Sequence, residues 1–74
     1  MVNISTTNPY YNTTYRISNV GKIGNEDATE DEFIENCKAN IGGGHPITFT
    51  DENGTFVSIT ADKFASVEIW KPRF

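Results

Sequence analysis

The chain has 74 residues, with ten acidic side chains, six basic ones and a single cysteine. A chain this short forms one small domain (residues 1–74) whose core is thin. One cysteine excludes a disulfide within the chain, and one Cys with one His supplies too few soft ligands for a structural zinc site. We therefore expect no metal and no cofactor, and expect the chain to gain buried surface as a homo-oligomer.

The charge balance and the N-terminal sequence exclude further classes. A net charge of −4 argues against a protein that binds nucleic acid directly through its phosphates. The start MVNISTTNPYY lacks the charge and the apolar run of a signal peptide, and no segment reaches transmembrane length. The expectation is a cytoplasmic protein without membrane contact, in the host cytoplasm if it is phage-encoded.

The first two segments differ in pattern. Residues 1–14 are rich in Asn, Thr and Ser, with a turn signal at Pro9, and we expect residues 1–12 to form a loose N-terminal arm or a short edge strand. Residues 13–20 alternate, with Tyr15 and Ile17 on one face and polar side chains on the other. This period of two predicts a half-buried strand.

A helix is predicted over residues 29–41. Thr29 and Glu32 have the spacing of a capping box, and acidic residues fill the first turn, where negative charge is favoured. Gly42 is the expected C-terminal cap. An apolar stripe at helical spacing marks the buried face, and Cys37 is expected to be a core residue within it. The stripe consists of Phe33, Ile34, Cys37 and Ile41.

Residues 46–60 predict a hairpin whose register can be argued. A three-residue loop with Gly54 in the left-handed position pairs Phe49 with Val57 and Ile47 with Ile59. All four apolar side chains then share one face. A four-residue loop would scatter them. The chosen register leaves Phe56 on the opposite face.

The C-terminal segments complete the fold prediction. Residues 61–65 form a tight connection in which Asp62 caps one turn, and residues 66–71 alternate as a last strand. The resulting class is α+β: a small antiparallel sheet, in β-α-β-β-β order, packed on one amphipathic helix. Phe56 and Trp70 are expected on the sheet face away from the helix, where another copy or a partner covers them.

The segment ITFTDENGTFVSITADKFASVEIW, about the last third of the chain, resembles the C-terminal β-meander of small phage and mobile-element accessory proteins. The shared pattern is a strand, a D/N-G turn, a strand ending in ADxxxS and a VEIW-like strand. The resemblance implies a small oligomeric accessory protein that interferes with a host function. It carries over no catalytic or ligand-binding residue.

The stretch GGGHP, residues 42–46, is unusual in composition. It lacks the Lys and Ser/Thr of a phosphate-binding P-loop, and its glycines end a helix instead of opening one. Helix termination is the favoured interpretation, with a backbone cradle for a ligand as the alternative. His45 is more typical of a loop residue than of a catalytic base. The candidate contacts for a small anionic ligand are Arg16, Gly43, Gly44, His45, Lys71 and Arg73.

These features lead to one functional expectation and two alternatives. We expect a non-enzymatic, phage-like accessory protein that self-assembles and inhibits or sequesters a host factor by binding it. One alternative is an oligomeric sponge that holds a small anionic ligand, such as a nucleotide signal, between subunits. The other is a small enzyme subunit, although no paired catalytic motif is present. The candidate contacts for a protein partner are Glu30, Asp31, Glu35, Phe56 and Trp70.

Overall fold

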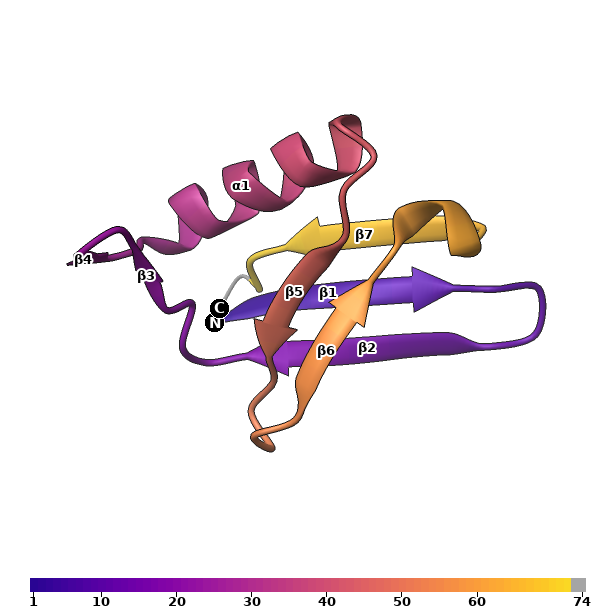
Figure 1. Ribbon diagram of the computed structural model, residues 1–74. Helices are drawn as coiled ribbons and strands as arrows, with labels where there is room; N and C mark the ends of the chain where they lie inside the picture. The colour runs from indigo at the N-terminus through magenta and orange to yellow at the C-terminus, as the bar shows by residue number, and fades with distance from the viewer. Residues whose placement is uncertain (73–74) are drawn as a thin grey trace.

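The main sheet of the protein has three strands (Figure 1). The computed structural model describes residues 1–72, except for the side chain of Ile23. Strand β1 (Val2–Thr7) lies in the centre, with β2 (Asn12–Ile17) on one side and β7 (Ser66–Trp70) on the other. Both neighbours run antiparallel to β1.

The register gives this sheet one apolar and one polar face. Ile4 lies between Tyr15 and Ile69, whereas the next residue, Ser5, lies between Thr14 and Glu68. Because successive side chains of a strand point to opposite faces, the aliphatic residues collect on one side. That side faces the core, and Ile4 is fully buried in it.

The prediction of a loose arm or a short edge strand at residues 1–12 is wrong. Residues 2–7 form the central strand of the sheet, and Val2 and Ile4 are both 0% exposed. The segment contains only two aliphatic side chains, and its remaining positions are small and polar. Those positions serve the outer face of the sheet or, like Thr6, fill the edge of the core, so the segment has the composition of a loop.

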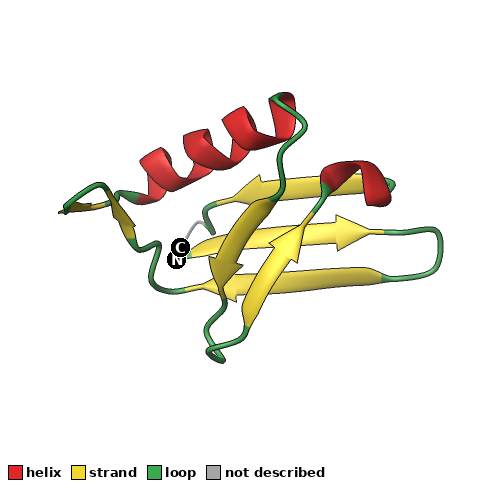
Figure 2. Cartoon of the chain, viewed as in Figure 1, coloured by secondary structure: helices red, strands yellow, loops and turns green. Residues whose placement is uncertain are grey.

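A second layer covers the apolar face of the sheet. It consists of helix α1 (Glu30–Gly42) and the hairpin of β5 (Ile47–Thr50) and β6 (Phe56–Ile59), as Figure 2 shows. A small ladder of β3 (Lys22–Ile23) and β4 (Glu26–Asp27) precedes the helix. The 3-10 turn η1 (Ala61–Lys63) joins the hairpin to β7. The buried core contains Val2, Ile4, Ile17, Phe33, Cys37, Ile47, Phe49 and Ile59.

Both ends of α1 follow from local chemistry. The predicted capping box is confirmed: the Glu32 amide donates to the Thr29 hydroxyl, and the Thr29 amide donates to the Glu32 carboxylate, both at 3.1 Å. At the C-terminal end the helix runs one residue further than predicted, and Gly43, not Gly42, is the cap. Gly44 takes the left-handed conformation, with φ of 75°.

The hairpin of β5 and β6 has the predicted register. Ile47 pairs with Ile59 and Phe49 with Val57, and Gly54 has φ of 81°. One carboxylate oxygen of Asp51 accepts the amides of Asn53 and Thr55, both at 2.9 Å, and so fixes the turn. The local sequence therefore determines both the turn and the face that is buried.

The α+β class is confirmed, and two details differ. The strands are divided between a three-stranded sheet and two separate hairpins, where a single sheet was expected. Asp62 does not cap η1, because the N-cap position is Thr60, whose side chain makes no capping hydrogen bond. The turn lets the chain leave the β5–β6 hairpin and enter the three-stranded sheet as β7.

Candidate partner-binding surface

The turn between β1 and β2 is held by one side chain. The Asn8 side-chain oxygen accepts the amide of Tyr10 at 2.9 Å and that of Tyr11 at 2.7 Å. The Asn8 amide in turn donates to the Tyr11 carbonyl oxygen at 2.9 Å. Asn favours such turns because its side chain can bind amides two and three residues ahead, and Pro9 fixes φ between them.

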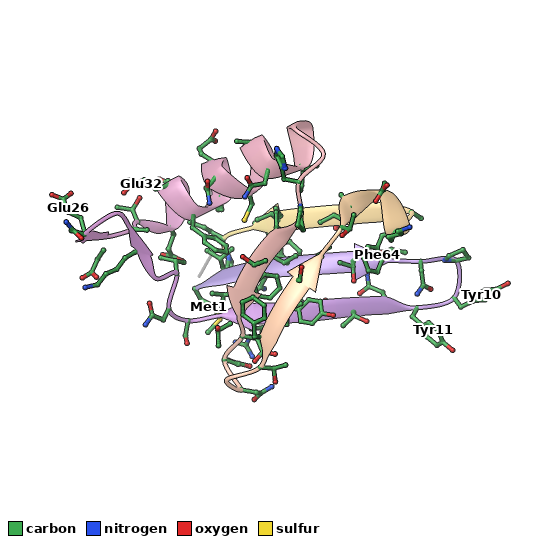
Figure 3. All side chains as sticks on the ribbon, viewed as in Figure 1. Met1, Tyr10, Tyr11, Glu26, Glu32 and Phe64 are labelled. Atoms are coloured by element: carbon green, nitrogen blue, oxygen red, sulfur yellow. The ribbon has the colours of Figure 1, made fainter. Side chains whose placement is uncertain are left out.

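The two tyrosines at this turn are exposed to solvent. Tyr10 is 86% exposed and Tyr11 is 70% exposed. Their ring centroids are 6.5 Å apart, with 64° between the ring planes. Both lie at the end of the β1–β2 hairpin, which extends past the second layer (Figure 3). We call residues 8–11 the tyrosine tip.

Phe56 and Trp70 do not share a face, contrary to the prediction. Phe56 is 70% exposed on the outer side of the β5–β6 hairpin, and Trp70 is 38% exposed on the outer side of the main sheet. The inner sides of these two layers enclose one core, so their outer sides point in opposite directions. A single partner surface cannot cover both residues in one flat contact.

The candidate acidic residues of α1 are compensated within the chain. Glu30 forms an ion pair with the N-terminal ammonium of Met1. Asp31 pairs with Lys71 at 2.7 Å, and Glu35 pairs with Lys38 at 3.3 Å. The Asp31 carboxylate, by hydrogen bond and charge, raises the pKa of Lys71 above its usual value. These pairs weaken the negative field that Glu30, Asp31 and Glu35 can present to a basic partner.

The candidate ligand residues do not come together within one chain. Lys71 lies beside the first turn of α1 through its pair with Asp31, whereas residues 43–45 follow the other end of the helix. Thirteen helical residues separate these positions by about 20 Å. Arg16 lies on the outer face of β2, 3.9 Å from the Glu52 carboxylate. Arg73 lies outside the described residues.

Residues 43–45 close α1 with a complete Schellman motif. The His45 amide donates to the Asn40 carbonyl at 2.7 Å, and the Gly44 amide donates to the Ile41 carbonyl at 3.1 Å. These are the two bonds that define the motif, and they use the amides that an anion would need. A Cβ on Gly43 would lie only 3.0 Å from the His45 ring. Helix termination and close packing therefore account for Gly43 and Gly44.

His45 and Gly44 line a small pocket beside the 3-10 turn. Its volume is about 120 Å³, and its other walls include Thr60 and Asp62. This space is below the range of roughly 300–1,000 Å³ that is usual for small-molecule sites. The loop is therefore poorly suited to hold a ligand of nucleotide size within one chain.

Cys37 is buried, as the sequence predicts, with 2% of its surface exposed. Burial raises the pKa of its thiol, because a thiolate would be poorly solvated in the core. A protonated, inaccessible thiol is a weak nucleophile. Among residues 1–72, no group of three or more His, Cys, Asp or Glu side chains is arranged to hold a metal ion.

Comparison with known protein families, with curated proteins and with solved structures finds no match to this chain. In the described part of the chain, no helix has the length and apolar character needed to cross a membrane.

The tyrosine tip was missed as a site at the sequence level. The Asn8-Pro9 turn signal was visible, but a firm strand was predicted only after it, at residues 13–20, so the signal did not indicate a hairpin. Once Thr7 is paired with Asn12, the same four residues become the tip of a hairpin. The useful signal was two adjacent tyrosines directly after a turn-forming Asn-Pro pair.

Proposed function

We propose that this chain is a small non-enzymatic binding protein that acts by docking its tyrosine tip on another protein. One observation carries the proposal: Tyr10 and Tyr11 are 86% and 70% exposed on a turn that Asn8 holds by three hydrogen bonds. Exposed large aromatics on an ordered turn have no role in the core of this domain.

Tyrosine suits such a contact for physical reasons. It contributes a large apolar area and a hydroxyl group, and it has few rotatable bonds to immobilise. Ordering a side chain at an interface costs about 0.5–1.5 kcal/mol, so a fixed turn reduces that cost. The matching partner surface is a concave apolar patch with hydrogen-bond acceptors for the two phenol groups.

Self-assembly is the second part of the proposal. Phe56 is as exposed as Tyr11, but it lies on the β5–β6 hairpin, whereas the tyrosine tip joins β1 and β2. This supports an interface between copies of the chain that is distinct from the partner contact. In the accessory-protein role proposed from the C-terminal meander, an assembly would present several tips to one host protein and inhibit it.

Two variants test the two contacts separately. The first replaces both Tyr10 and Tyr11 with Ser, and the second replaces Phe56 with Ser. The immobilised chain is incubated with lysate of the cells that contain it, and retained proteins are quantified against each variant. We expect one set of proteins to be lost with Y10S/Y11S and retained by F56S. Equal retention by the tip variant would contradict the docking role.

Sedimentation of the purified chain tests the assembly. We expect a concentration-dependent oligomer at micromolar concentration that F56S dissociates and Y10S/Y11S leaves unchanged. A monomer at all concentrations would contradict self-assembly without affecting the tip proposal.

A further inference from the structure

A groove runs along one side of β5. It has a volume of about 390 Å³, which lies within the usual range for binding sites. One wall is the chain that leaves β2, residues 18–22, and the other is residues 48–51. Phe33 and Phe49 contribute to its lining, and both side chains are otherwise buried.

Among residues 1–72, the backbone of β5 has no neighbouring strand on this side. The Asp51 amide donates to the Thr55 carbonyl at 2.9 Å, which makes this a hydrogen-bonded pair across the hairpin. In an antiparallel ladder such pairs alternate with pairs whose backbone groups point away from each other. The amide and carbonyl of Phe49 therefore point toward β6, whereas those of Thr48 and Thr50 point outward, away from β6. Both threonines line the groove.

One bond shows that this edge can accept a neighbouring strand. The Glu52 amide has the same outward direction as those of Thr48 and Thr50, and it donates to the Arg16 carbonyl at 2.8 Å. After Arg16 the chain diverges from β5. The Asn19 side chain and Gly21, with φ of 78°, turn it into the β3–β4 ladder. The divergence leaves a gap beside Thr48 and Thr50, whose outward amides and carbonyls have no backbone partner within residues 1–72.

We propose that this gap is a docking site for an extended peptide segment of a partner protein, which pairs with β5 as an added strand. An extended peptide is the ligand that supplies alternating amides and carbonyls at the spacing of a strand edge. Residues 48–51 span about 10 Å, enough for three or four peptide residues.

The lining of the groove specifies the peptide further. A peptide residue opposite Phe49 points to the same face as that ring, so it enters the apolar part of the lining beside Phe33. Its two neighbours point outward, like Thr48 and Thr50, and are polar. Lys22 lines the groove and forms no ion pair within residues 1–72, although Asp27 lies opposite it in the ladder. The favoured sequence is therefore polar–apolar–polar with one acidic residue nearby.

This site is separate from the tyrosine tip, and neither proposal depends on the other. The test uses a phage-displayed library of random eight-residue peptides, panned on the intact chain and counter-panned on Thr50→Pro. Proline removes the outward amide of Thr50, which the hairpin ladder does not use. Thr50→Val, which keeps that amide, is the matched control. Circular dichroism establishes that both variants fold.

We expect peptides with the alternating pattern to bind the intact chain and T50V, and to bind T50P at least tenfold more weakly. Failure to enrich any peptide on the intact chain over T50P would overturn the proposal. If T50P does not fold, the selected peptide is compared with its N-methylated form, in which the donors facing Thr48 and Thr50 are blocked. Equal affinity of the two peptides would also overturn it.

Amide shifts in a nuclear magnetic resonance titration locate the peptide. The proposal predicts shifts at residues 48–51 and 18–22, with none at the tyrosine tip. Shifts confined to other residues would contradict the site. Pairing of the β5 edges of two copies, seen as a dimer that T50P dissociates and peptide does not compete with, would assign the edge to self-association instead.

Discussion

Replacing Ile4 with Ala tests whether β1 is the centre of the fold. Ile4 is fully buried between Tyr15 and Ile69. The change removes three carbon atoms, worth about 0.8 kcal/mol each in transfer free energy, and leaves a cavity. Large-to-small substitutions of this kind lower the free energy of unfolding by about 2–5 kcal/mol. A chain of 74 residues has a total of only about 4–11 kcal/mol.

The assay is thermal and urea unfolding followed by circular dichroism. For a domain this small, each kcal/mol corresponds to about 4–8 °C in Tm, so a loss of about 3 kcal/mol lowers Tm by roughly 20 °C. Thr14→Ala is the control, because Thr14 is exposed on the neighbouring strand and its loss should change stability by less than about 0.5 kcal/mol. An I4A variant as stable as T14A would refute the central position of β1 and restore the loose arm.

Further predictions concern the end of the helix, the buried thiol and the exposed ion pair. Gly44→Ala should destabilise by about 1–2 kcal/mol because φ is positive there, whereas Gly42→Ala, which meets open space, should stabilise by up to about 1 kcal/mol in urea unfolding. Equal effects would contradict the Schellman geometry. Because burial raises the Cys37 pKa, the folded state holds the thiol proton more tightly than the unfolded state does. The protonated thiol makes its full contribution to the free energy of unfolding below the ordinary thiol pKa, and this contribution is lost as the pH rises through the raised pKa of the folded state. The free energy of unfolding of Cys37→Ala should therefore fall less steeply at alkaline pH. A thiol that reacts with Ellman's reagent at pH 8 as fast in the folded as in the unfolded chain would contradict burial. Asp31→Asn should return the Lys71 pKa toward its ordinary value, measurable by resonance titration, with little change in Tm because the pair is exposed.

The sequence predicted the elements whose signals are local. The capping box of Thr29 and Glu32 and the Gly54 turn each require only residues a few positions apart, and both are present in the structure. The alternation of Val67 and Ile69 likewise predicted the inner face of β7, where both are half-buried.

The features that were missed depend on contacts distant in sequence. Ile4 becomes central only because β7, more than sixty residues later, pairs with β1. The separation of Phe56 from Trp70 depends on η1, which moves the chain from one layer to the other. The candidate ligand residues were chosen by chemical type, and the length of α1 keeps Lys71 apart from His45. A local sequence pattern cannot predict the distance between these two residues.

The central claim is that the tyrosine tip is the contact with the partner, and a binding titration tests it most directly. A protein that the intact chain retains is titrated with the intact chain, with Y10S/Y11S and with F56S. A single central aromatic contact is worth about 2 kcal/mol or more, so the loss of even one of the two rings should weaken binding by the tip variant at least thirtyfold. When both are titrated at concentrations at which the chain is monomeric, the affinity of F56S should stay within about twofold of that of the intact chain, because Phe56 lies outside the tip. Unchanged affinity of the tip variant, with the fold intact, would contradict the account.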